Sequence, residues 1–334
     1  MKIISLFCGA GGMDLGFIKA GHKIVWANDN DQDSIDTYSK YFKRKYNASS
    51  KHISCADITD VIINDIPDGD VVIGGFPCQG FSIANPYRKE KDSRNTMYLE
   101  LLRVIKGKNP KYFVAENVPG LCSIGGYDND NDRKEHKGKV LKVIIKELEN
   151  ATKIGYTVNF KILNAADYGV PQNRKRIIIL GTRNDISKKL SHPKQTHINP
   201  KKRDLDLKKL KVYKSVEEAI LDLPEPGEKK GSKKILNHIG TKHRVKINGF
   251  IGNRKTDPKK PSPTIVGRGG GTGGPVIIPH PNGNRRMTVR ETARLQSFPD
   301  DFEFIGSISS CYRQIGNAVP WPLAYHIAKM IPKK

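Results

Sequence analysis

Seven short apolar runs, separated by segments with helical spacing, fill the first 183 residues of the chain. Several of these runs, such as IISLF, VVIGG and RIIIL, are apolar at nearly every position, which is typical of parallel strands covered on both faces. The alternation predicts a doubly wound α/β sheet. The expected strands are Lys2–Phe7, Lys23–Asn28, His52–Ala56, Asp70–Gly74, Lys111–Glu116, Thr157–Leu163 and Arg176–Gly181. The expected helices between them are Met13–Ala20, Asp33–Tyr41, Thr96–Lys106 and Gly138–Ala151.

The positive charge of the chain is concentrated in one region. The formal net charge is +24 over 334 residues, and residues 186–260 hold 21 Lys/Arg against 8 Asp/Glu. A Lys-rich surface is the plain interpretation, but an excess gathered in one region favours a polyanionic partner such as nucleic acid. Regular patterning returns at Thr288, and a last helix is expected over Pro320–Ile331. We therefore expect one domain from residues 1–185 and 308–334, and a smaller basic domain with its hinge from residues 186–307.

Cysteine usage and hydropathy exclude several classes of protein. The five cysteines are odd in number and form no C-x-x-C pair, so neither a disulfide framework nor a structural zinc site is expected. No apolar run is long enough to cross a membrane, and the N-terminal stretch lacks a signal-peptide pattern. We expect a cytoplasmic protein without a membrane partner.

A glycine-rich turn follows the first expected strand. It reads Phe7-Cys8-Gly9-Ala10-Gly11-Gly12 and leads into a helix, an arrangement that lets a ligand approach the backbone closely. Asp29 and Asp57 end the second and third strands, where a carboxylate can bind ribose hydroxyls or an adenine amino group. Each feature alone fits a tight turn or a helix cap. Together, in strand order, they predict a site for an adenosine-containing cofactor.

Four further residues lie near the same edge of the predicted sheet. Cys78 follows the fourth strand within GGFPCQGFS, and Glu116 ends the fifth strand. Arg174 and Arg176 alternate in QNRKR, just before the last strand, and so share one face. Taken singly, a cysteine is usually a small core residue and an arginine a surface charge.

The order of these motifs resembles the DNA (cytosine-5)-methyltransferases of restriction–modification systems. FCGAGG, FPCQGFS, ENV, QNRKR, RETARLQSFPDDF and QIGNAVP occur in the family's order, and the likeness covers Lys2–Arg183 and Met287–Ala328. The resemblance implies a doubly wound, Rossmann-like S-adenosylmethionine-dependent methyltransferase sheet with a smaller target-recognition domain. It also implies methyl transfer to cytosine carbon 5 in double-stranded DNA, with S-adenosylhomocysteine as the product and no metal.

Roles for the four residues follow from the resemblance. Cys78 would add to cytosine carbon 6, because carbon 5 is a poor nucleophile until a thiolate activates the ring. Glu116 would contact N3 and the exocyclic amine, Arg176 would bind O2, and Arg174 would support the same pocket. Chemistry on the ring face implies that the base is flipped out of the helix.

The resemblance also assigns cofactor and DNA contacts. Asp29 stands where the family usually has Glu, and Asn30 stands where an apolar residue often covers the adenine, so contacts there are expected to differ. The cofactor residues are Phe7, Gly9, Ala10, Gly11, Gly12, Asp29, Asn30, Asp57, Ile58, Pro77, Met97, Asn317 and Ala318. The DNA contacts are Gln79, Ser82, Arg88, Thr264, Arg268 and Thr272, with lysines of the basic region meeting phosphates.

Two alternatives stay open at this point. A branch of the same family modifies tRNA with the same residues, although the basic insertion and the FPCQGFS context favour DNA. A non-catalytic DNA-binding regulator on this fold is expected to have lost Cys78 or Glu116, and both are present. We expect a monomer that is paired in function with a restriction endonuclease, acting in a bacterial cytoplasm or on the nucleoid.

Overall fold

The computed structural model describes residues 1–77, 97–123, 138–202, 209–226, 235–240, 245, 255–267, 278–283 and 285–333. Within them, seven strands form one sheet in the order β3-β2-β1-β4-β5-β7-β6. All seven expected strands are confirmed, each to within two residues at either end. The strands are β1 (Lys2–Leu6), β2 (Lys23–Asp29), β3 (Ile53–Cys55), β4 (Val71–Gly75), β5 (Tyr112–Asn117), β6 (Tyr156–Asn164) and β7 (Lys175–Arg183).

The sheet is mixed, and one strand direction differs from expectation. Strands β1 to β5 pair in parallel, but β7 runs antiparallel to both β5 and β6. The interpretation of the RIIIL run as a parallel strand was therefore wrong. β7 returns from β6 through a short connection and inserts between β6 and β5, which fixes its direction. Its continuous apolar character reflects burial on both faces, which a central antiparallel strand shares.

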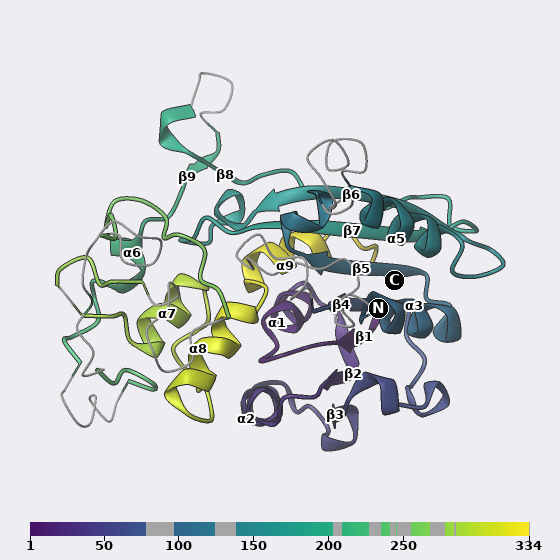
Figure 1. The fold of residues 1–334 in the computed structure, drawn as a ribbon, viewed down its shortest axis with the longest axis horizontal. Helices are drawn as coiled ribbons and strands as arrows, with labels where there is room; N and C mark the ends of the chain where they lie inside the picture. Colours follow the sequence, from purple (N-terminus) through teal and green to yellow (C-terminus); the bar gives the residue numbers. More distant parts are fainter. Residues whose placement is uncertain are drawn as a thin grey trace, which may run out of the picture.

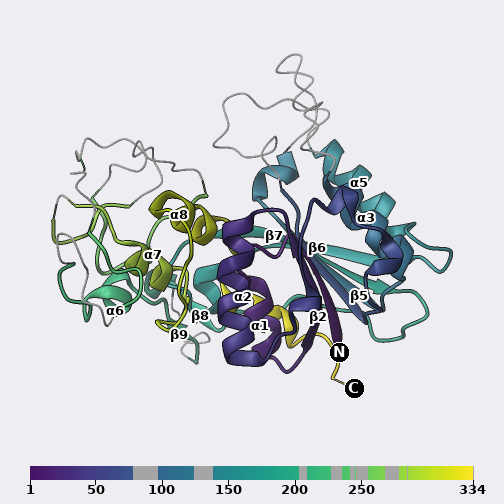
Figure 2. The same cartoon turned by 90° about the horizontal axis from the view of Figure 1, so that it is seen from below.

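Alternate residues of the central strands enter two separate cores. Val71 and Ile73 of β4 join the core beneath α1 and α9, whereas Val72 joins the core beneath α3 and α5. Figure 2 shows these helix layers on opposite sides of the sheet. The expected helices are confirmed as α1 (Gly12–Lys19), α2 (Gln32–Tyr46), α3 (Met97–Lys108), α5 (Lys139–Glu149) and α9 (Trp321–Ala328).

The two ends of the chain meet in one layer. Helix α9 packs on α1, and a Cβ built on Gly16 would lie only 2.5 Å from the Ala324 Cβ. This close approach brings the C-terminal motif beside the glycine turn, and the figures show both termini near the sheet (Figures 1 and 2). The last helix therefore helps to build the layer that the first helix begins.

A third core lies beyond the sheet, where α2 faces the C-terminal helices. Tyr41 and Phe42 of α2 pack on Phe302, with ring centroids 4.3 and 6.5 Å apart respectively. Figure 1 shows α6, α7 and α8 grouped beside the sheet. The three helices are α6 (Val216–Ile220), α7 (Val289–Leu295) and α8 (Ile308–Asn317). Two further short strands, β8 (His197–Ile198) and β9 (Lys211–Val212), pair with each other.

Short 3-10 helices complete the described structure. They are η1 (Ser50–His52), η2 (Ile58–Asp60), η3 (Ile63–Asp65), η5 (Pro119–Ser123), η6 (Ala165–Tyr168) and η7 (Pro200–Lys202). In the part of the chain that the structure describes, no helix has the length and apolar character needed to span a membrane.

Candidate active site

The glycine turn has the backbone of a ligand-binding loop. Gly9 and Gly11 have φ values of 53° and 86°, and Phe7 also lies in the left-handed region at 53°. A strained non-glycine residue is typical of functional turns. A Cβ built on Gly9 would meet no atom within 4 Å, so one side of the turn is open. A Cβ on Gly11 would lie 2.4 Å from Phe42, so the turn rests directly on α2.

Asp29 ties the end of β2 to this turn. Its Oδ2 accepts a hydrogen bond from the Gly9 amide at 2.8 Å, and its Oδ1 accepts from the Asp31 amide at 3.0 Å. Burial raises the pKa of the Asp29 carboxyl, although both amides act to lower it. Asn30 is exposed beside it.

Asp57 follows β3 and is half-buried. Its Oδ1 accepts from the Thr59 amide at 3.0 Å, so it caps η2, and these bonds lower its pKa. The Asn30 side chain also acts to lower the Asp57 pKa, and Ile58 next to Asp57 is buried. The open face at Gly9 and the two strand-end carboxylates fit the ribose and amino groups of S-adenosylmethionine.

Glu116 and Arg176 form a buried ion pair at the same edge of the sheet. Glu116 Oε1 lies 2.8 Å from Arg176 Nε, and the two residues are 7% and 8% exposed. Glu116 pairs with Gly75 in the β4–β5 register, and a Cβ on Gly75 would lie 3.0 Å from Glu116 Oε2. Only Phe76 and Pro77 separate Gly75 from Cys78 in the sequence. The structure thus brings Glu116 and Arg176 together beside the strand that leads to the cysteine.

Arg174 makes a different set of contacts. Its Nη1 donates to the Ile265 carbonyl at 2.6 Å and its Nη2 to the Gly316 carbonyl at 2.8 Å. The residue is 1% exposed, and burial together with the charge of Arg176 lowers the pKa of its guanidinium. These bonds tie the chain just before β7 to two segments about 90 and 140 positions away, which assigns Arg174 a positioning role.

Two buried glutamines extend this junction. Gln172 Oε1 accepts from the Ile265 amide at 3.0 Å, and its Nε2 donates to Gln296 Oε1. Gln296 Nε2 in turn donates to the Ala318 carbonyl at 2.6 Å. The sequence motifs contain both glutamines, but no role was expected for them, because their partners are distant in sequence.

The C-terminal motif lies between the junction and the glycine turn. Asn317 is exposed, and a Cβ on Gly267 would lie 1.8 Å from its Oδ1, so the Asn317 side chain packs directly on the Gly267 backbone. Ala318 packs beside Gly12, whose Cβ would lie 3.2 Å from the Ala318 Cβ. Thr264 Oγ1 donates to the Asn173 carbonyl at 2.6 Å, which anchors the segment that precedes residue 268.

The remaining predicted residues are distributed as follows. Pro77 is exposed after β4, and Met97 begins α3 and packs partly buried against its core. Cys78, Gln79, Ser82, Arg88, Arg268 and Thr272 lie outside the described residues. Their roles stay predictions from the sequence.

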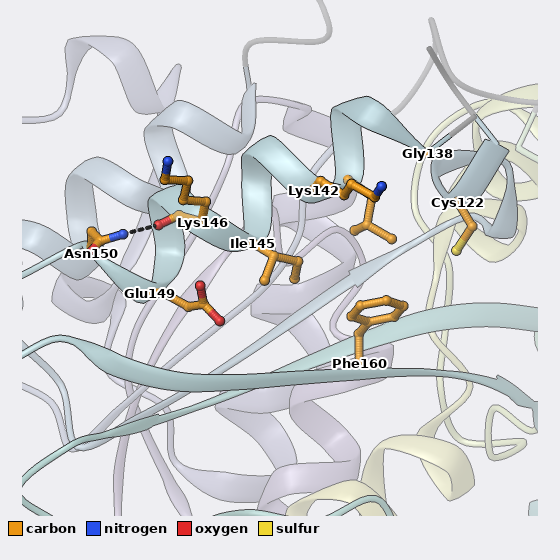
Figure 3. A pocket seen from close by; sticks show the side chains of 9 residues that line it. Cys122, Gly138, Lys142, Ile145, Lys146, Glu149, Asn150 and Phe160 are labelled. Atoms are coloured by element: carbon orange, nitrogen blue, oxygen red, sulfur yellow. Dashed lines mark hydrogen bonds between the residues drawn. The ribbon is translucent and has the colours of Figure 1, made fainter. Parts of the chain in front are cut away.

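A separate groove lies on another part of the surface. It has a volume of ≈ 620 Å³ and lies between α5 and β6 (Figure 3). Ile145, Phe160 and Cys122 line its apolar part, and Lys142 and Lys146 flank it. It contains none of the predicted site residues, so the candidate active site is the strand-end cluster and not this groove.

We expect replacement of Arg174 by alanine to destabilise the fold. Two buried carbonyls would lose their donor, so the free energy of unfolding in urea should fall by about 3 kcal/mol or more. The control is Lys175→Ala, since Lys175 is the exposed next residue in the sequence and should change stability by less than about 0.5 kcal/mol. Equal, small effects of the two substitutions would contradict the positioning role.

Comparisons with known proteins show relatives along nearly the whole chain. The family model described as C-5 cytosine-specific DNA methylase matches residues 1–333. Type II methyltransferase M.NgoFVII of Neisseria gonorrhoeae is 37% identical over 350 residues, covering 99% of this chain and 86% of that protein. Type II methyltransferase M.FnuDI of Fusobacterium nucleatum is 34% identical over 356 residues, covering 99% and 94%.

Solved structures share the fold. A crystal structure from an E. coli prophage, described as a DNA modification methyltransferase, aligns with a TM-score of 0.69 at 24% identity, covering 99% of this chain and 98% of that one. A Spodoptera frugiperda DNMT2 structure aligns with a TM-score of 0.63 at 20% identity, covering 98% of each chain. These likenesses confirm the expected methyltransferase sheet. With the family match over nearly the whole chain, they lead to the conclusion that this protein belongs to the C-5 cytosine-specific DNA methylase family and is a DNA (cytosine-5) methyltransferase.

Proposed function

We propose that this enzyme methylates cytosine within one specific sequence of double-stranded DNA, through a covalent adduct of Cys78 with a flipped-out base. The observation that carries the proposal is the buried Glu116–Arg176 pair at 2.8 Å, beside the strand that leads to Cys78. A cation and a carboxylate fixed side by side suit a pyrimidine that offers both acceptor and donor atoms. The proposed pocket therefore holds the base by its polar edge while the thiol attacks the ring.

The proposed reaction has two stages, addition of the thiolate and its elimination. The Cys78 thiolate forms a bond to carbon 6, and the electrons of the carbon 5–carbon 6 double bond shift toward carbon 5 and the ring. As the charge develops, N3 takes up a proton that it gives up again when the thiolate leaves. Glu116 accepts hydrogen bonds from N3–H and the amine, and Arg176 donates to O2, so the developing charge is stabilised. After carbon 5 has been methylated it loses its proton, the double bond re-forms and the thiolate leaves.

S-Adenosylmethionine, when bound, supplies the methyl group as an electrophile. Phe7, Gly9 and Asp29 of the glycine turn and the end of β2 would hold it, together with Asp57 and Asn317. The full set of proposed cofactor contacts is that predicted from the sequence. That the reaction needs no metal stays a prediction.

We assign target recognition to residues 186–307. Their charge and their position between the two parts of the catalytic domain support the assignment. The segment 262–267 leads to Arg268 and Thr272. Gln172 and Arg174 bond to Ile265 and so hold this segment against the chain that leads into β7. Contacts to base edges by Thr264, Arg268 and Thr272, and by Gln79, Ser82 and Arg88, are proposals.

The relatives favour DNA over tRNA as the substrate. Those with 37% and 34% identity are named Type II methyltransferases, a class that works alongside restriction endonucleases. We therefore propose that the enzyme protects DNA from a cognate endonuclease in the cytoplasm, as a monomer.

Conversion sequencing of DNA from bacteria that express the protein tests this proposal. We expect protected cytosines at one short sequence and none in cells that carry the empty vector. A fully converted genome, with methylated cytosine found instead in the RNA of the same cells, would transfer the assignment to the tRNA alternative. Conversion of both nucleic acids would support the non-catalytic alternative.

A further inference from the structure

A buried carboxylate lies beneath the glycine turn, and the proposed chemistry gives it no role. Asp14 is in the first turn of α1 and is 0% exposed. The Ser5 hydroxyl donates to Asp14 Oδ1 at 2.7 Å, and the Tyr38 hydroxyl donates to Asp14 Oδ2 at 2.8 Å. Both carboxylate oxygens therefore have a neutral donor.

The three side chains come from the three elements that build the turn. Ser5 is on β1, which leads into the turn, Asp14 is on α1, which begins in it, and Tyr38 is on α2, which packs beside it. A Cβ on Gly11 would lie 2.7 Å from Tyr38 Cδ2, so the Tyr38 ring, together with Phe42, supports the turn. Asp14 holds that ring by its hydroxyl and holds the strand through Ser5.

Fold stability alone does not account for a carboxyl group at this position. Burial raises the Asp14 pKa from 3.8 to about 6, although both hydroxyls lower it. The Asp14 charge also acts on the pKa values of Cys8 in the turn and of Tyr38 on α2, which burial raises well above their ordinary values. A buried group that is charged near neutral pH weakens a fold, so another benefit is expected of it.

We propose that Asp14 is a positioning residue for the cofactor, holding Ser5 and Tyr38 so that the Phe7–Gly12 turn keeps the backbone shape that receives S-adenosylmethionine. The proposal rests on the assignment of this turn as the cofactor site. It adds three side chains to the site, of which none was predicted from the sequence.

Binding of S-adenosylhomocysteine by calorimetry tests the proposal. Asp14→Ala leaves both hydroxyls without their acceptor, and we expect its affinity to fall by about tenfold or more. Asp14→Asn keeps the shape and one acceptor, so its affinity should stay within about threefold of wild type. Affinity of the cofactor-free variants for duplex DNA should be unchanged. If Asp14→Ala bound S-adenosylhomocysteine as tightly as wild type, or lost affinity for DNA to the same extent, the proposal would be overturned.

Two tyrosines on one helix provide a matched pair. Tyr38→Phe removes the hydroxyl that Asp14 holds, whereas Tyr41→Phe removes a hydroxyl from a ring that packs on Phe302. Tyr38 and Tyr41 are 2% and 3% exposed. We expect weaker S-adenosylhomocysteine binding only in Tyr38→Phe. Equal affinities of the two variants would contradict the proposal, and failure of the wild type to bind would instead refute the cofactor site itself.

A pH series adds a second readout. Because the folded-state pKa of Asp14, about 6, exceeds the ordinary 3.8, the folded chain binds this proton more tightly than the unfolded chain. The stabilisation that comes from protonated Asp14 is therefore present at low pH and is lost as pH rises through about 6. Relative to wild type, Asp14→Asn should gain stability as pH rises from about 4 to about 6, and the difference should level off above that. A difference that does not change with pH would show that Asp14 is not the buried acid described.

Discussion

Cys78→Ala is expected to abolish methyl transfer while leaving cofactor binding intact. Without the thiolate no bond forms to carbon 6, carbon 5 stays a poor nucleophile, and turnover should fall on the order of 10⁴-fold or more. The measurement is transfer of labelled methyl groups to duplex DNA that carries the target sequence. Binding of S-adenosylhomocysteine should match wild type, because the glycine turn and Asp29 are unchanged.

The matched control for this substitution is Cys55→Ala. Cys55 is an exposed thiol at the end of β3, next to the proposed cofactor site. In the sheet, β2 and β1 lie between β3 and β4, the strand that leads to Cys78. It should retain wild-type turnover within about twofold, since surface substitutions of this kind have small effects. Methylation by Cys78→Ala at the wild-type rate would refute the proposed nucleophile.

Glu116→Gln should be the second most damaging substitution. The amide has the same shape but no charge, so it stabilises the attacked ring poorly and removes the negative charge beside the buried Arg176 guanidinium. We expect kcat to fall by about 10²- to 10³-fold, with little change in S-adenosylhomocysteine affinity. Single-turnover methylation kinetics would separate the chemical step from product release.

Glu100→Gln provides the comparison for that result. Glu100 also pairs with an arginine, Arg103, at 2.7 Å, but on α3, where Arg103 keeps its bonds to the Ile58 and Val61 carbonyls when the Glu100 charge is removed. Loss of this pair should leave kcat unchanged. If both variants slowed turnover equally, loss of any Glu–Arg pair would explain the effect, and the catalytic role of Glu116 would be contradicted.

Much of the sheet could be predicted because burial leaves a mark on composition. Each of the seven strands is a short run with apolar positions, and β7 is buried along nearly its whole length. Composition reports burial and not direction, however, and so it did not show that β7 is antiparallel. Direction is set by how β6 and β7 connect, which depends on turns and not on the apolar pattern of the strand.

The candidate site was predictable only in part. Glu116 and Asp29 end buried strands, so the topology of the sheet places them at one edge. The bonds of Arg174 and Gln296, in contrast, reach carbonyls from distant segments. No local pattern encodes such partners. Asp14 also gave no signal, because an acidic residue in the first turn of a helix is ordinary.

The most direct measurement of the central claim uses duplex DNA with 5-fluorocytosine at the target position. Fluorine at carbon 5 cannot leave as a proton does, so the enzyme should stay covalently attached after methyl transfer. We predict a denaturation-resistant protein–DNA adduct with wild-type enzyme and S-adenosylmethionine, mapped by mass spectrometry to Cys78, and no adduct with Cys78→Ala. An adduct formed by Cys78→Ala, or attachment through another residue, would contradict the account.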